Sequence, residues 1–60
     1  MEAELNYYRR RSVQENAAAA AAHNGKVRSV HLELERRYDE KISAIEAELN
    51  HVQLHLISND

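Results

Sequence analysis

The sequence predicts an all-α protein, an antiparallel hairpin of two helices that forms a single helical-hairpin domain over residues 1–60. Three observations lead to this prediction. Strong helix formers fill the chain and proline is absent, the single glycine follows an asparagine at Asn24-Gly25, and apolar residues recur at steps of three and four in the second half. Together they indicate two helices separated by one short turn.

The first helix is expected over residues 2–23. Glu2 and Glu4 in its first turn and His23 in its last suit the helix dipole. A run of six alanines, residues 17–22, makes this helix thin, so that a partner helix can approach closely. The row expected to face the partner consists of Leu5, Tyr8, Ser12, Asn16, Ala19 and His23.

The turn is expected at residues 24–25, with Asn24-Gly25 as a left-handed cap that ends the first helix. The second helix would then run over residues 26–57. Because one glycine costs only about 1 kcal/mol within a helix, a continuous-helix coiled coil is the alternative architecture.

The second helix carries the clearest apolar pattern in the chain. Its stripe consists of Val27, Val30, Leu34, Tyr38, Ile42, Ile45, Leu49, Val52 and Leu56. Folding at the turn places residue i roughly opposite residue 49 − i, which brings Arg9–Arg11 level with residues 38–40 and matches basic with acidic side chains. Within the stripe, His31 is expected to bond a polar side chain such as Glu35 or Asn16.

A homodimer is expected, because a chain of 60 residues buries little surface alone and the second helix overhangs the first over residues 48–58. The simplest closed assembly is a four-helix bundle of two hairpins. The residues expected at this oligomer interface are Tyr38, Ile42, Ile45, Leu49, Val52, Leu56 and Ile57.

Composition narrows the possible functions. Ten acidic and eight basic residues give a net charge of −2, there is no cysteine, and no apolar segment is long enough to span a membrane. No catalytic constellation or phosphate-cradling glycine loop is present, so we expect neither an enzyme nor a cofactor. The expectation is a cytoplasmic protein that acts through self-association and protein–protein interaction, with a partner that the sequence does not identify.

Two alternative functions rest on local clusters. Tyr7 and Arg9, Arg10 and Arg11 combine stacking rings with phosphate-binding cations, which would suit a small RNA-binding regulator. Glu48, His51 and His55 have the spacing of metal ligands along one helix face. Because a single helix supplies all three, the sequence predicts no native metal site there, although adventitious zinc or nickel can bind.

Residues 7–38 carry a resemblance to known proteins. Tyr7-Tyr8-Arg9-Arg10-Arg11, the alanine run, and the segment from Val27 to Leu34 followed by Tyr38 resemble short alphaproteobacterial helical-hairpin proteins with a Tyr-Tyr-Arg-Arg-Arg tract. The resemblance implies a helical hairpin and no activity, cofactor or site residues.

Overall fold

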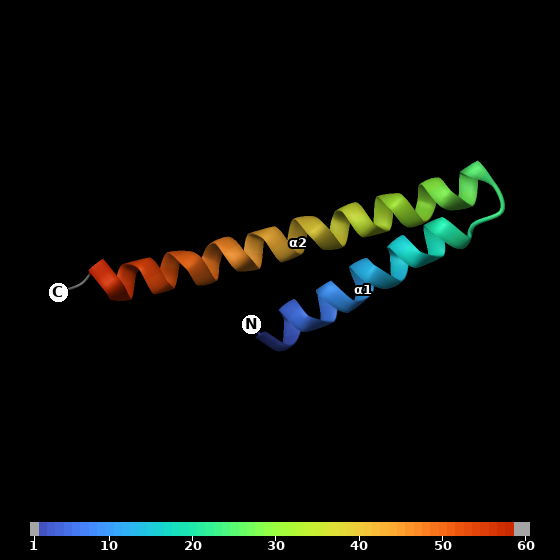
Figure 1. Cartoon of the computed structure of the whole chain (residues 1–60). Helices are drawn as coiled ribbons and strands as arrows, with labels where there is room; N and C mark the ends of the chain where they lie inside the picture. The colour runs from blue at the N-terminus through green and yellow to red at the C-terminus, as the bar shows by residue number, and fades with distance from the viewer. Residues whose placement is uncertain (1, 59–60) are drawn as a thin grey trace.

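The computed structural model describes the backbone of residues 2–58 and the side chains of residues 2–52. Helix α1 comprises Glu2–Ala21 and helix α2 comprises Gly25–Ser58. They lie side by side in opposite directions, and α2 extends beyond the start of α1 (Figure 1). The molecule measures 56 × 16 × 12 Å. The prediction of a two-helix, all-α chain is therefore confirmed for the described residues, and the continuous-helix alternative is wrong.

Asn24 begins α2 as its N-cap. Its side-chain Oδ1 accepts a hydrogen bond from the backbone N–H of Val27 at 2.8 Å, and its carbonyl accepts one from Arg28 at 3.1 Å. No described residue has a positive φ, so the expected left-handed cap at Asn24-Gly25 is wrong. Gly25 is instead the first residue of α2, because capping by Asn24 lets the helix start one residue earlier than expected.

At the end of α1, a free backbone carbonyl accepts a hydrogen bond from a side chain of α2. This helix stops at Ala21, two residues before the expected end, so His23 lies in the turn rather than in the last helical turn. Arg28 reaches back from α2 and donates a hydrogen bond to the carbonyl of Ala22 at 3.4 Å. A cation near a helix C-terminus both binds a free carbonyl and complements the dipole.

All described residues that are buried lie on α1. They are Leu5, Ser12, Glu15 and Ala19. With the partly buried Tyr8 they form a row with alternating steps of three and four, the spacing of a helix packed against one neighbour. The expected row is thus wrong at two places: Asn16 and His23 are exposed, and Glu15 takes the position that was expected for Asn16.

The register between the helices agrees with the expected pairing in the middle of the hairpin. Arg11 reaches Tyr38, and Ser12 reaches Asp39. At the open end Leu5 and Leu49 line the same hollow, so that α1 begins level with a later part of α2 than expected. The overhang, defined here as residues 51–58 of α2, is accordingly shorter than the predicted residues 48–58.

Within the described part of the chain, neither helix combines the length and the apolar character that a membrane span needs.

Candidate functional site

The interface between the two helices is organised around the carboxylate of Glu15. Its Oε1 accepts a hydrogen bond from Nδ1 of His31 on α2 at 2.6 Å, and its Oε2 accepts one from Arg11 on α1 at 2.7 Å. The Glu15 side chain is only 7% exposed. A buried carboxylate is tolerated when its lone pairs are satisfied in this way, and here each oxygen has a charged or polar donor.

Arg11 joins Glu15 to the aromatic residues of the interface. Its Nε donates to the hydroxyl of Tyr38 at 3.4 Å, and its guanidinium lies 5.6 Å from the centre of that ring. The hydrogen bond with Tyr38 raises the pKa of Arg11, and the negative charge of Glu15 adds to the effect. The ring of Tyr38 in turn lies 6.0 Å from that of Tyr8, so aromatic packing continues towards the open end.

A second set of polar contacts joins other residues of the two helices. The buried hydroxyl of Ser12 donates to Asp39 at 2.5 Å, and Asn16 donates to Glu35 at 3.2 Å. The pair of Ser12 and Asp39, together with the contacts of Glu15 and Arg11, forms a group that we call the inner cluster: Arg11, Ser12, Glu15, His31, Tyr38 and Asp39. No buried side-chain polar atom of the described residues lacks a hydrogen-bond partner. These pairs fix which turn of α2 each turn of α1 contacts.

The apolar stripe of α2 is turned partly away from α1. Successive residues of an α-helix are turned by about 100° around its axis. Seen along the axis of α2, the mean direction of the residues that hydrogen-bond to α1 differs by roughly 70° from the mean direction of the apolar stripe. Helix α1 therefore covers one edge of the stripe and leaves the other edge uncovered. We call this uncovered edge the open rim. Its members are Val27, Val30, Leu34, Ile45 and Val52. Val30 is 57% exposed and Val52 48%.

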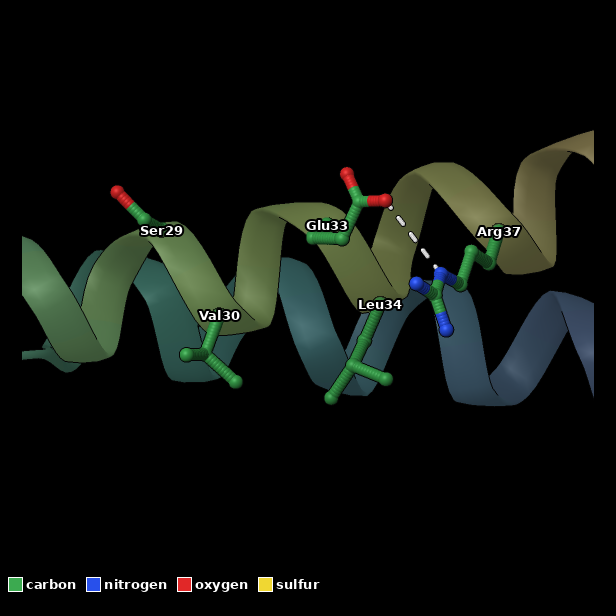
Figure 2. Close-up of a pocket in the computed structure, with 5 residues that line it drawn as sticks. All are labelled: Ser29, Val30, Glu33, Leu34 and Arg37. Atoms are coloured by element: carbon green, nitrogen blue, oxygen red, sulfur yellow. Dashed lines mark hydrogen bonds and ion pairs between the residues drawn. The ribbon is translucent and has the colours of Figure 1, made fainter.

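A shallow hollow of about 350 Å³ lies in the half of the open rim near the turn. Val30 and Leu34 point to the same side of α2 in this hollow, whereas Ser29 and Glu33 point to the other side (Figure 2). The two apolar side chains form its floor, and Arg37 closes one end. A surface of this chemistry fits an apolar side chain of another helix better than a polar ligand.

Ion pairs within α2 border the hollow. Arg36 donates to Glu33 at 2.7 Å, and Arg37 donates to the same carboxylate at 3.4 Å. The hydrogen bond from Arg36 lowers the pKa of Glu33 to about 2 from its ordinary value of 4.5, and the same bond raises the pKa of Arg36. Arg36 also pairs with Glu40, so ion pairs at helical spacings of three and four follow this exposed face of α2.

The residues expected at an oligomer interface are divided by the structure between two surroundings. Tyr38, Ile42 and Leu49 are partly buried and lie on the edge of the stripe towards α1. Ile45 and Val52 belong to the open rim. Leu56 and Ile57 lie outside the residues whose side chains are described. Two additional residues that no interface prediction included, Val30 and Leu34, line the hollow.

The arginine tract is largely occupied by contacts within the chain. Arg9 pairs with Glu46 on α2 at 2.7 Å, and Arg11 pairs with Glu15. The expected acidic partners at residues 39 and 40 are engaged elsewhere, with Ser12 and Arg36, which explains why Arg9 reaches further along α2. Arg10 and Tyr7 are exposed on α1. The tract is thus divided among different directions instead of forming one cationic surface.

The metal-ligand candidates are partly outside the described side chains. Glu48 and His51 are exposed on α2, and His55 lies among the residues whose side chains are not described. In the described residues, no group of three histidine, cysteine or acidic side chains is placed to hold a metal ion.

Glu15 is the site residue that sequence reasoning missed. Steps of three and four from Leu5 through Tyr8 and Ser12 lead to position 15, and this continued alternation was the available signal. A charged residue at a buried position counts against such an assignment unless its partners are known. Here the expected histidine partners, Glu35 and Asn16, are wrong: they bond each other, and His31 bonds Glu15.

Comparison with known proteins finds no protein-family model, no curated protein and no solved structure that matches this chain. The resemblance to alphaproteobacterial hairpin proteins stays a prediction.

Proposed function

We propose that this protein acts by association with a second copy of itself, with two hairpins docking into a four-helix bundle that serves as a protein–protein interaction module. The observation that carries the proposal is the open rim. Helix α2 is the more apolar helix, yet none of its described residues is buried, whereas α1 places Ser12 and Glu15 in the interior. An isolated hairpin would thus leave its best apolar surface in water.

The accessible area of the chain supports the same proposal. The hairpin exposes 4779 Å², whereas a compact monomer of 6.9 kDa exposes about 4,000 Å². The difference is similar to the area of about 800 Å² that each partner loses in a protein–protein interface of standard size. A dimer would therefore give this chain the surface-to-mass ratio of an ordinary small domain.

Self-association is preferred to nucleic-acid binding because of the contacts of the arginine tract. The carboxylates of Glu46 and Glu15 neutralise Arg9 and Arg11, and the chain as a whole is acidic. Affinity for a polyanion depends on cations that are available to replace its counterions. The open rim, in contrast, carries apolar side chains that need no neutralising partner.

The experiment compares a charge in the open rim with the same charge outside it. Val30→Asp places a carboxylate in the hollow, whereas Val13→Asp places one on α1, where Val13 is 69% exposed. Sedimentation equilibrium should show dimers for the wild type and Val13→Asp, and monomers for Val30→Asp. The proposal is wrong if the wild type is monomeric at every concentration measured, or if Val30→Asp remains as dimeric as the wild type. Val30→Leu, which keeps the rim apolar, should retain the dimer.

A further inference from the structure

We infer that the two copies pack with their α2 helices antiparallel, so that the overhang of each copy lies in the hollow of the other. This inference rests on the proposed self-association and adds the geometry of the contact. It predicts which residues meet across the dimer, namely Val30 with the partner's Val52.

Two separate parts of the open rim need cover. One is the hollow at Val30 and Leu34, in the half of α2 that α1 accompanies. The other is the exposed Val52, towards the end of α2 that extends past the start of α1 (Figure 1). They lie on the same side of α2 and are separated by about 30 Å along the helix at 1.5 Å per residue.

A two-fold axis near residue 41 places the hollow of one copy opposite the overhang of the other. In a two-fold dimer, if residue i contacts residue j of the partner, then residue j contacts residue i. Antiparallel α2 helices centred near Lys41 bring the hollow of each copy over the overhang of the other, at both ends of the dimer. Each apolar segment that the hairpin leaves open is then covered by the other one.

Charges beside the rim favour the antiparallel direction over the parallel one. In a parallel pair, Arg37 of one copy lies level with Arg37 of the other, so that like charges face each other there. Lys41 lies level with its own copy in both directions, because the two-fold axis passes near it, and so it does not distinguish them. In the antiparallel register Arg37 comes level with the partner's turn of residues 45–48, which carries the exposed Glu48. Opposite charges at the flank of a helix pair stabilise one orientation against the other.

The arrangement also predicts the length of the dimer. Helix α2 has 34 residues, and full antiparallel overlap of two such helices adds no length beyond the 56 Å of a single hairpin. A dimer joined only through the tips of the overhangs would be nearly twice as long.

Disulfide cross-linking tests the contact directly, because the chain has no native cysteine. The double variant Val30→Cys/Val52→Cys is oxidised in a glutathione buffer and compared with each single variant and with Val13→Cys. We expect covalent dimers from the double variant at roughly tenfold the yield of any single variant, since disulfide formation needs Cα atoms within about 7 Å. Within one chain residues 30 and 52 are about 33 Å apart along α2, so they cannot pair with each other.

The outcomes separate the two proposals. Efficient cross-linking of Val30→Cys alone would mean a parallel pair and would overturn the antiparallel inference. Dimers in sedimentation that do not cross-link in the double variant would overturn the inference and leave the proposed self-association standing. Monomers in sedimentation, without cross-links in any variant, would overturn both.

Discussion

The two sides of α2 differ in the side chains that they carry: polar contacts dominate the side towards α1, and apolar side chains dominate the opposite, uncovered side. The side towards α1 is held by the inner cluster, in which a buried carboxylate, a buried hydroxyl and a histidine bond across the interface. The other side, the open rim, carries valine and leucine in contact with solvent. Polar groups thus share the interior of the hairpin with Leu5 and Ala19, whereas the apolar side chains of the open rim remain in contact with solvent.

This difference assigns separate tasks to the two surfaces. Hydrogen bonds are directional, so the inner cluster specifies which turns of α1 and α2 meet. It contributes little net stability, because Leu5 and Ala19 are the only buried apolar residues among those described. The apolar surface that would stabilise the fold lies on the open rim. Folding of this chain is therefore expected to depend on its association.

The largest expected effects come from truncating one side chain in the inner cluster and one in the open rim. Glu15→Ala removes the carboxylate that accepts hydrogen bonds from Arg11 and His31, so that both side chains lose this acceptor. We expect it to lower the free energy of unfolding by about 1–3 kcal/mol at every protein concentration. Val30→Ala should act differently, because Val30 is largely exposed in the hairpin. Its effect in urea unfolding followed by circular dichroism should grow as concentration rises and dimers form.

The comparison would fail if the two variants behaved alike. An effect of Val30→Ala that does not change with concentration would mean that the open rim stabilises the single hairpin. An effect of Glu15→Ala near zero would mean that the inner cluster is dispensable for the fold.

The turn offers an intermediate test, with effects of opposite sign at neighbouring residues. Asn24→Ala removes the N-cap of α2 and should lower the free energy of unfolding by about 1 kcal/mol. Gly25→Ala should raise it by about 0.4–1 kcal/mol, because Gly25 has no positive φ and an added Cβ meets nothing within 4 Å. Thermal unfolding measures both. Destabilisation by Gly25→Ala would contradict the helical start of α2.

The smallest expected effect concerns the ion pairs beside the hollow. Because the folded pKa of Glu33 is lowered to about 2, its pairing stabilises α2 fully above the ordinary value of 4.5 and is lost as the pH falls through about 2. An NMR titration of the Glu33 carboxyl should show this low midpoint, and Arg36→Gln should move it towards the ordinary value. An unchanged Glu33 midpoint in Arg36→Gln would refute the assigned cause.

The sequence was sufficient for the two helices and for their register in the middle of the hairpin, but not for the register at the open end or for the way the helices face each other. Absence of proline and the step pattern of α2 predicted two helices, and the position of the turn placed Arg11 beside Tyr38. The row of α1 was wrong at Asn16 because burial of Glu15 depends on donors from two helices, which no single-helix pattern contains. Periodicity located the apolar stripe of α2 but does not encode which of its edges a neighbouring helix covers.

The most direct test of the account follows the methyl groups of valine, leucine and isoleucine by NMR while the protein is diluted. Self-association through the open rim predicts concentration-dependent shifts at Val30, Leu34, Ile45 and Val52, with no change at Val13 on α1. Methyl signals that stay constant over the whole dilution series, or shifts centred on Val13 instead of the rim, would contradict the claim that a second copy covers this edge of α2.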